Sequence, residues 1–551
     1  MPRSSGPRPG ALFAAIAAAS LLAGCRVDVN GAPCTTPGDG SDCPDGQACG
    51  NDLRCSARAL ACAASRCEPD ASSCSTTAVD TAIRCDRNVD PVCGRWVVDD
   101  CGARGLLCPI PGSGACECPS YAGTTVVADP SRGSRHVNAP PFPTGQGDLP
   151  ECRFGRLWDA LWAATAAGPG ATVQIEGAAG SAVVFGAATG EDWPLFVATN
   201  VTVLAAHVPA GRTVIQGEAS AATLVQLLGT LDGVRVEGNG AKGVGVAVSC
   251  AAGGYPTLRN VAVAGGSTVD PDGIATAGLA QGVTVSGGCG ARLTGVQVAG
   301  IAGPALTIGP VDPAGATTVE VLGGSFGASS TGIWIRGGRV ALKTDPETAA
   351  SVVASGNAWE GVVVGGQGER LPFSSTAVEV ALERVVMDGN GGTGLVFAGL
   401  PLLPTQSRVR VSGCDLHANG AVRPAHYGSA SARRSAGGVL VDLPDVITQF
   451  TFGGNRLWSN QGDDLAFQSN ASWSISPGAC GSSSNVFACA PGDCPGGHCA
   501  VATAGTGQVW AAYNVWPDLQ VEPYYVTSAV RNTDTYCTGD EPGVPPIPSC
   551  P

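Results

Sequence analysis

One spacing in the second half of the chain brings together residue types that could do chemistry. Two residues before a recurring asparagine, successive copies of a short phrase carry a hydroxyl, a carboxylate, an imidazole and an indole: Ser355, Asp388, His417 and Trp458. Four residues before the same asparagine, an acid and a guanidinium occupy equivalent positions, at Asp415 and Arg456. A carboxylate and an imidazole can carry out general acid–base catalysis, and an indole face can stack on a sugar ring. We call these six residues the candidate strip.

Three interpretations of the candidate strip stay open from the sequence: a solvated surface with one ion pair, a sugar-binding surface, and a catalytic surface. If each copy of the phrase forms one coil, and coils stack about 4.8 Å apart, Asp388, His417 and Trp458 form one outward row. We expect Trp458 to point to solvent and to stack on a sugar, while Asp388 and His417 bond its hydroxyl groups.

A repeated phrase must position these side chains. An asparagine is followed four residues later by glycine or aspartate, and then by an apolar–x–apolar triplet; the cleanest copies start at Asn239, Asn357, Asn390 and Asn460. A phrase that recurs every ~25–40 residues is typical of a repeat architecture. The alternation in the triplet predicts a short strand, and the stretches between copies predict a second. The asparagine is expected to supply turn geometry, and its amide can bond to neighbouring turns.

Strands this short bury a face only when successive turns stack. The inward residues of the triplet strands then stack on similar residues of the adjacent turns and form one apolar core. These inward pairs are Val244/Val246, Val283/Val285, Ile333/Ile335, Val362/Val364, Leu395/Phe397, Val439/Val441 and Leu465/Phe467. A chain of 551 residues with 80 glycines and few charged residues agrees with a solenoid of short strands.

Residues 150–475 resemble the right-handed parallel β-helix of the pectate-lyase-like superfamily, with its short parallel β-helix repeats. The resemblance implies an all-β fold class: a right-handed parallel β-helix (solenoid) with an N-terminal capping helix, preceded by a small disulfide-rich module. Helical spacing between Phe154 and Thr165 agrees with the capping helix. Two segments, Gly266–Gly278 and Ala421–Ser435, leave the repeat as loops, and loops on a rigid scaffold often carry function.

The enzymes of this superfamily act on acidic polysaccharides, and the resemblance implies which residue types they would use. Lyases pair a Ca²⁺-binding acidic cluster with a basic residue that abstracts a proton, and hydrolases use clustered aspartates. The outward positions of the triplet strands are small or apolar with one isolated acid, Asp442. They carry no pair of carboxylates at the separation of ~5–10 Å that glycoside hydrolysis requires.

Other motifs predict neither a cofactor nor a metal. Gly238–Gly243 and Gly389–Gly394 match G-x-G-x-x-G, but strands follow them, so we predict turns instead of a dinucleotide site. Asp270 and Asp272 are too few for the six to eight oxygen ligands of Ca²⁺. The sequence therefore favours a non-catalytic function, either glycan binding and adhesion or a structural role at the cell surface. The alternative is a polysaccharide lyase or glycoside hydrolase that acts on acidic polysaccharide.

The N-terminal segment has the features of a targeting signal. Two arginines and the apolar run Ala11–Leu22 lead to Leu-Ala-Gly-Cys25, which resembles a bacterial lipoprotein signal in which Cys25 is lipidated. An ordinary secretory signal that ends near a chance cysteine is the alternative. Arg26 resembles outer-membrane sorting, so we predict a lipid-anchored outer-membrane protein on the cell surface or the periplasmic face. A net charge of −14 without a basic tract argues against nucleic acid and against membrane contact beyond the anchor. We expect a monomer that has a polysaccharide as its partner.

Twenty-four cysteines in an exported chain predict disulfides. Lipidation of Cys25 leaves an odd number, and we expect the unpaired one to be Cys414, which would face inward beside Val385. Cys250 and Cys289 share one offset from the triplet glycine, so they are predicted to pair across adjacent coils. Local pairs are predicted near the C-terminus: Cys480–Cys489, Cys494–Cys499 and Cys537–Cys550.

Composition divides the chain into five predicted segments. Residues 1–25 form the signal and 26–118 a Cys-rich disulfide module, for which zinc is the alternative to disulfides. Residues 119–150 are a Pro/Gly-rich linker, 151–470 the β-helix, and 471–551 a disulfide-tied C-terminal cap.

Overall fold

The structure is a computed structural model of the whole chain, and its description covers the better-placed residues. These are 43, 47–49, 54–57, 66–67, 72–74, 81–86, 94–101, 125–131, 153–177, 181–205, 212–249, 254–266, 278–286, 290–309, 318–365, 378–398, 408–420, 436–442, 449–468, 472–476, 478–488, 499–503, 507–516, 530–531, 536–538 and 542–546. The chain divides into two compact units, residues 1–117 and 118–551, and each is described by itself.

The first unit contains short antiparallel strands held by disulfides. A disulfide joins Cys43 to Cys55, and both Cys55 and Cys101 are buried. The strands are β1 (Gln47–Cys49) paired with β2 (Cys55–Ala57), and a four-stranded sheet in the order β3 (Arg66–Cys67), β6 (Gly94–Asp100), β5 (Thr81–Asp86), β4 (Ser72–Cys74). This agrees with the predicted disulfide-rich module, because few apolar side chains are available here to form a core.

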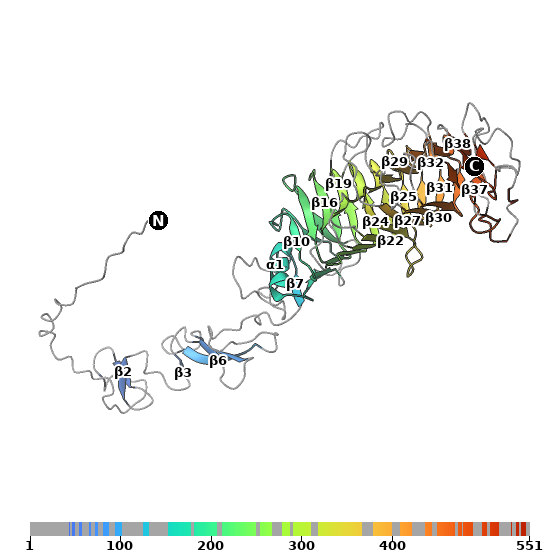
Figure 1. The fold of residues 1–551 in the computed structure, drawn as a ribbon. Helices are drawn as coiled ribbons and strands as arrows, with labels where there is room; N and C mark the ends of the chain where they lie inside the picture. The colour runs from blue at the N-terminus through green and yellow to red at the C-terminus, as the bar shows by residue number, and fades with distance from the viewer. Residues whose placement is uncertain are drawn as a thin grey trace, which may run out of the picture. The chain divides into compact units, whose positions relative to one another are not determined.

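The second unit is a right-handed parallel β-helix. All the strand pairs between successive coils are parallel, and they build one sheet of 11 strands and one of 20. Figure 1 shows the strands of successive coils lying side by side. The smaller sheet holds β10 (Leu195–Val197), β13 (Thr223–Leu227), β16 (Val244–Ser249), β19 (Gln281–Ser286), β21 (Pro304–Ile308), β23 (Thr331–Ile335), β26 (Val362–Gly365), β29 (Leu395–Ala398), β32 (Ala436–Asp442), β35 (Asp463–Phe467) and β38 (Val501–Thr503).

The larger sheet contributes two strands to each later coil, so a coil there has three sides, as in β27, β28 and β29. Its members are β7 (Thr125–Ala128), β8 (Thr172–Ile175), β9 (Val183–Phe185), β11 (Thr202–Leu204), β12 (Thr213–Gln216), β14 (Thr230–Asp232), β15 (Arg235–Glu237), β17 (Thr257–Arg259), β18 (Ala262–Ala264), β20 (Ala291–Ala299), β22 (Thr318–Gly327), β24 (Gly338–Lys343), β25 (Val352–Ser355), β27 (Val378–Glu383), β28 (Val386–Asp388), β30 (Arg408–Ser412), β31 (Asp415–His417), β33 (Gln449–Gly453), β34 (Arg456–Trp458) and β37 (Val486–Ala488).

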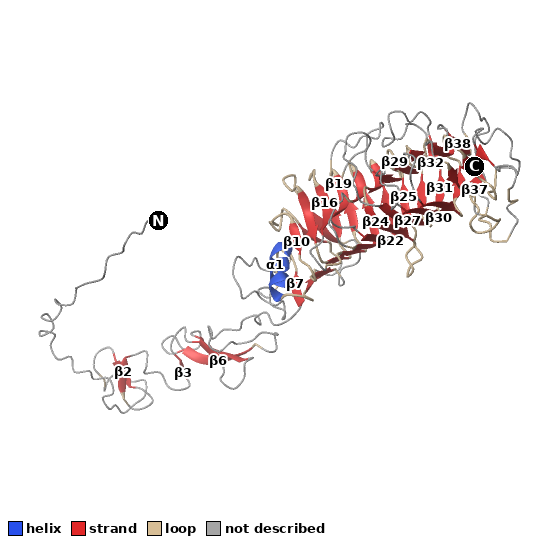
Figure 2. Ribbon diagram, viewed as in Figure 1, coloured by secondary structure: helices blue, strands red, loops and turns tan. Residues whose placement is uncertain are grey.

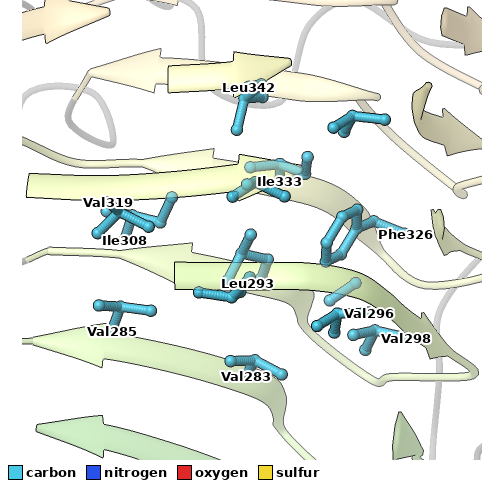
Figure 3. Close-up of a cluster of buried hydrophobic side chains, with 14 of the residues drawn as sticks. Val283, Val285, Leu293, Val296, Val298, Ile308, Val319, Phe326, Ile333 and Leu342 are labelled. Carbon is cyan, nitrogen blue, oxygen red and sulfur yellow. The ribbon is translucent and has the colours of Figure 1, made fainter. Parts of the chain in front are cut away.

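The core lies inside the coils and follows the predicted register. Val364 pairs with Phe397, which pairs with Val441, and these inward side chains are fully buried. Figure 3 shows the same piling in earlier coils, where Val285 and Ile308 are register partners. Each such side chain stabilises the fold by about 1.5–3 kcal/mol relative to an exposed one. The predicted inward residues of the triplet strands are thereby confirmed, except at Val244/Val246. There Val246 and Val248 are the buried partners of Val283 and Val285, and Val244 is only half-buried.

A ladder of buried amides runs along one corner of the coils. The Asn357 side chain donates to Asn390 Oδ1 at 2.8 Å, and Asn390 donates to Asn419 Oδ1 at 2.8 Å. Asn419 then donates to Asn460 Oδ1 at 3.1 Å. Because each asparagine also bonds backbone groups of an adjacent coil, the ladder satisfies polar groups that the turn would otherwise bury unpaired.

The turn geometry at this corner is not supplied by these asparagines themselves. The residue before each of them has the positive φ, at 61° for Gly356, 60° for Gly389 and 53° for Ala418. Asn239, in an earlier coil, differs because it has φ 42° itself and is exposed. The repeated asparagine therefore has two structural roles. Asn239 itself adopts the left-handed backbone conformation, whereas Asn357, Asn390 and Asn419 form the buried ladder with their side chains.

A second ladder begins at Cys414 on another corner. The Asn455 Oδ1 accepts from Cys414 N at 3.0 Å, and the amides of Asn455, Asn485 and Asn514 continue the chain of bonds. The Cys414 thiol is free and fully buried. This confirms the prediction that Cys414 is unpaired and faces inward.

One helix closes the N-terminal end of the coils. Helix α1 (Leu157–Ala167) packs against β7, β8 and β10 (Figure 2), with Leu157 and Leu161 buried. Glu191 accepts from Leu157 N at 3.0 Å and from Trp158 N at 2.8 Å, so a carboxylate satisfies the open amides of the first turn. Among the residues that the structure describes, no helix is long and apolar enough to cross a membrane.

The coils extend beyond the predicted limits of the β-helix at both ends. Strand β7 falls within the segment 119–150 expected to be a linker, yet it pairs in parallel with β8. At the other end, β37 pairs with β34 and β38 pairs with β35, both after residue 470. A small sheet of β36 (Trp473–Ser474), β39 (Val509–Trp510) and β40 (Val530–Arg531) follows.

The local disulfide pairs predicted near the C-terminus are wrong for two cysteines. Cys480 is bonded to Cys537, across 57 residues, and not to Cys489, nor Cys537 to Cys550. Coil stacking explains the difference, because it brings segments that are a full coil apart in sequence into contact. Cys499 is disulfide-bonded. The other predicted partners lie outside the described residues, so their pairings stay predictions: Cys250, Cys289, Cys489, Cys494 and Cys550.

Removing one rung of the amide ladder should destabilise the β-helix. Asn390→Ala removes the Oδ1 that accepts from Asn357 N and Nδ2 and the amide that donates to Asn419 Oδ1, which should lower the free energy of unfolding by about 2–4 kcal/mol. Denaturant unfolding monitored by circular dichroism measures this. Asn239→Gly is the control, since it keeps the positive φ and loses one bond of 3.2 Å, at a cost below about 1 kcal/mol. Equal stability of the two variants would contradict the role of the ladder.

Candidate functional site

The candidate strip occupies one outward row on the strands β25, β28, β31 and β34. Ser355 is the register partner of Asp388, and Asp388 is the partner of His417. His417 is in turn the partner of Trp458. The spacing from the asparagines therefore predicted the register correctly, although binding of a ligand by these residues stays a prediction.

The imidazole of His417 lies between two carboxylates. Its Nε2 is 3.2 Å from Asp388 Oδ1, and its Nδ1 is 3.4 Å from Asp415 Oδ1. The Nδ1 contact lacks the geometry of a good hydrogen bond and is best described as a charge contact. The two carboxylates differ in access, because the Asp388 side chain is 43% exposed whereas that of Asp415 is 16% exposed.

Asp415 is the anchor of this cluster. Its Oδ1 accepts a hydrogen bond of 2.8 Å from Trp458 Nε1, and its Oδ2 forms an ion pair with Arg456. Burial raises the pKa of Asp415, but the contact with His417 and the hydrogen bonds from Trp458 and Arg456 outweigh it and hold the pKa below its usual range. Asp415 is therefore an ionised, fully engaged carboxylate.

These neighbours also set the protonation of His417. The Asp415 carboxylate raises the pKa of His417 above its usual value, partial burial opposes this, and the charge of Asp388 adds to the increase. A histidine normally titrates near neutral pH, so these contacts favour the protonated form of His417 there.

Trp458 is half-buried, and His417 covers part of its indole, so it points to solvent less freely than expected; sugar stacking on it stays a prediction. His417 stacks on the ring at a centroid distance of 4.4 Å and an interplanar angle of 9°. On the next coil, Trp458 packs against the cluster that contains Val486 and Ala488. In-register stacking places the two rings directly above one another, so the indole is half-buried and orients the imidazole.

The outward face of the smaller sheet is covered, which the sequence did not predict. Its side chains are small or apolar, as expected, but they are buried: Thr307, Trp334, Val363, Val396, Leu440, Ala466 and Ala502. Trp334 also donates through Nε1 to Gly365 O at 2.9 Å. From β21 to β38 this sheet therefore offers no open surface in the part of the chain that is described, whereas Phe196 on β10 is 44% exposed.

A groove that the sequence reasoning missed lies on the coils that carry Asp388 and His417. It has a volume of about 590 Å³, and it lies where the larger sheet bends between β24, β27, β30 and the following strands. We call it the cationic groove. It is lined by Lys343, Thr344, Asp345, Pro346, Ala349, Glu383, Arg384, Arg410, Ser412 and Gly413.

The sequence feature that could have indicated the cationic groove is an insertion at one corner of a coil. Residues 344–351 connect β24 to β25, whereas residues 384–385 and 413–414 alone make the equivalent connection in the next two coils. The loop projects from the sheet in Figure 2. Asp345 fixes it by accepting from Glu347 N at 3.0 Å and from Thr348 Oγ1 at 2.6 Å.

Within the described ranges, no three histidine, cysteine or acidic side chains gather closely enough to hold a metal ion. The acid–base cluster has two carboxylates and one imidazole, but Arg456 takes up the charge of Asp415.

The comparisons with known proteins concern the fold. No family model matches the chain, and no curated protein matches it. Among solved structures, the A-module of the Azotobacter vinelandii mannuronan C-5 epimerase AlgE4 is similar, with 13% identity over 67% of this chain and 94% of that one and a TM-score of 0.35. The AlgE6 A-module has 14% identity over 69% and 94%, with a TM-score of 0.29. An alginate lyase from Paenibacillus sp. str. FPU-7 has 11% identity over 74% and 98%, with a TM-score of 0.19.

These comparisons correct the expectation of a non-catalytic binding, adhesion or structural role. The three similar structures are named as two mannuronan epimerase modules and an alginate lyase. Because the likeness is one of fold, residue roles must come from the geometry of the site itself.

The position of His417 between two carboxylates can be tested by its titration. Asp388→Asn should lower the pKa of His417, because a carboxylate that stabilises the imidazolium is lost. Nuclear magnetic resonance titration of the imidazole measures this, and the chain has five histidines to assign. Glu379→Gln removes the same charge from a neighbouring strand and should change the pKa less. An unchanged pKa in Asp388→Asn would show that the contact is not formed.

Proposed function

We propose that the protein is an enzyme that cleaves an acidic polysaccharide by β-elimination, with His417 as the group that transfers the proton. The observation that carries the proposal is the imidazole held between the partly buried carboxylate of Asp415 and the more exposed carboxylate of Asp388. The cationic groove on the same coils supports an acidic substrate, because Lys343, Arg384 and Arg410 line it.

The cluster assigns a direction to the proton transfer. Asp415 is ionised and lies beside Nδ1, so it favours the tautomer that carries the proton there. The lone pair is then on Nε2. Because Nε2 lies 3.2 Å from Asp388 Oδ1, the exposed Asp388 side chain must turn toward solvent before Nε2 can accept a proton. Nε2 would remove the proton on the carbon next to the substrate carboxylate. A carbon–carbon double bond forms, the bond to the leaving sugar oxygen breaks, and that oxygen takes a proton from water. The resulting hydroxide takes the proton from Nε2, which restores the neutral imidazole.

Elimination fits the cluster better than hydrolysis does. Glycoside hydrolysis uses two carboxyl groups, one of which must donate a proton or attack the sugar. Asp415 is unsuited to either task, because its lowered pKa keeps it ionised and Trp458 and Arg456 occupy its oxygens. Asp388 is then the one accessible carboxylate in the cluster.

We also propose that the enzyme is lipid-anchored through Cys25 in the outer membrane. The support is the sequence from Ala11 to Cys25, which lies outside the described residues. A lipid anchor on a disulfide-tied N-terminal module would hold the β-helix near polysaccharide outside the cytoplasm.

Loss of the imidazole should remove elimination without unfolding the protein. His417→Gln should lower the initial rate of unsaturated product formation from polyuronates by about 10²–10⁴-fold, the usual contribution of general acid–base catalysis. Ultraviolet absorbance of the new double bond measures the rate. In wild type, the rate should rise with pH through the raised pKa of His417, and in Asp388→Asn this rise should move to lower pH.

Gln449→Ala, an exposed change on β33, is the matched control and should keep the wild-type rate. Thermal unfolding of each variant separates loss of chemistry from loss of fold. New reducing ends without the unsaturated product would replace elimination by hydrolysis, and no cleavage of any polyuronate by the wild type would overturn the proposal.

Lipidation has its own test. Cys25→Ala in the full chain should abolish incorporation of a labelled fatty acid and release the protein from membranes, because the acylated thiol is removed. Cys414→Ala is the control and should keep both properties, since this thiol is buried. Labelling that persists in Cys25→Ala would contradict the anchor.

A further inference from the structure

The cationic groove carries charge that the protein does not neutralise. Three cations line it, Lys343, Arg384 and Arg410, and none of them forms an ion pair with another described residue. Elsewhere on the same sheet, arginines are paired with acids of the next coil, as Arg339 is with Glu379 at 2.7 Å. In a chain of net charge −14, an unpaired basic cluster needs an explanation.

The two acids of the groove, Asp345 and Glu383, offset two of the three positive charges, so one positive charge remains in excess. Asp345 is nearly fully buried, and both of its oxygens are used to fix the loop. Glu383 is the register partner of Lys343, so it can offset one cation at most. Arg384 and Arg410 then remain as donors that face an open volume.

We propose that the cationic groove binds the carboxylates of successive sugars in an anionic polysaccharide chain. This inference takes its ligand class from the proposed function and adds the residues that hold the chain away from the reacting bond. Guanidinium groups bind carboxylates through paired N–H donors, and an ammonium group binds them as a point charge.

The arrangement of the cations favours a linear chain over a single small anion. Lys343, Arg384 and Arg410 come from three successive coils, on or next to β24, β27 and β30. Coils are stacked about 4.8 Å apart, so the cations are spread along the axis of the β-helix instead of converging on one point. A polymer with one carboxylate on each sugar matches such a row.

The walls of the groove are preorganised for binding. Asp345 N donates to Ala350 O at 2.8 Å and Ala349 N donates to Asp345 O at 2.8 Å, so the projecting loop is closed on itself. On the opposite side, Arg384 lies across Gly413, where an added methyl group would come within 3.4 Å of its Cγ. Little order has to be imposed when the chain binds, which favours affinity.

Binding of oligouronates of defined length to the full chain, measured by calorimetry at two salt concentrations, tests the inference. Arg384→Gln and Arg410→Gln should each weaken binding by about twofold to fivefold and reduce its salt dependence. Glu383→Gln should strengthen binding, because it removes the carboxylate that repels the ligand. Arg408→Gln is the matched control, since Arg408 is exposed on the same strand as Arg410 but does not line the groove.

The outcomes separate this inference from the proposed function. Unchanged binding in Arg384→Gln and Arg410→Gln, with elimination still lost in His417→Gln, would overturn the groove and leave the enzyme. Weakened binding in those variants without any elimination by the wild type would support the groove and overturn the enzyme. A sulfated glycan serves as a second probe, and preference for it would replace the carboxylate by a sulfate ester. Equal binding of a single-stranded oligonucleotide would overturn the assignment to a polysaccharide.

Discussion

Parallel stacking in register is the constraint on which the rest of this structure depends. Each side chain has the equivalent residue of the next coil about 4.8 Å away. Each position must therefore hold a residue that can pack against, or bond to, the equivalent residue of the adjacent coil. Apolar residues satisfy this rule by piling up, as Val364, Phe397 and Val441 do. Amides satisfy it because each can donate and accept, which allows Asn357, Asn390 and Asn419 to form a ladder.

Charged residues satisfy the same rule by alternating in sign. Arg292 pairs with Glu320 at 2.8 Å on the next coil, and Arg456 pairs with Asp415. The cationic groove is where this alternation fails, because Arg384 and Arg410 have no such partner among the described residues. The cluster of Asp388, His417 and Asp415 follows the rule, but it places a histidine between two acids, which raises the pKa of the histidine.

The repeat made the fold and the row of the candidate strip predictable, because both depend on residue spacing alone. Counting back from Asn390, Asn419 and Asn460 placed Asp388 opposite His417 and His417 opposite Trp458. The same alignment predicted the buried, unpaired Cys414. Contacts that depend on side-chain conformation were not accessible in this way, so the stacked rings of His417 and Trp458 were missed.

Features formed by breaks in the repeat were also hard to predict. The groove depends on the loop of residues 344–351, which has no counterpart in the neighbouring coils. The bond between Cys480 and Cys537 joins segments that follow the last clear copy of the phrase, where the spacing gives no register. Strand β7 is four residues long and lies among prolines and glycines, so its alternation was too short to be recognised.

The reactivity of the Cys414 thiol can report local opening of the β-helix. The thiol is fully enclosed by the coils, and burial raises its pKa to about 12. Because the thiolate is the reactive form, an alkylating reagent can reach it only when neighbouring coils separate. The alkylation rate of this one buried sulfur therefore measures how often the solenoid opens locally at its middle, an event that global unfolding experiments do not resolve.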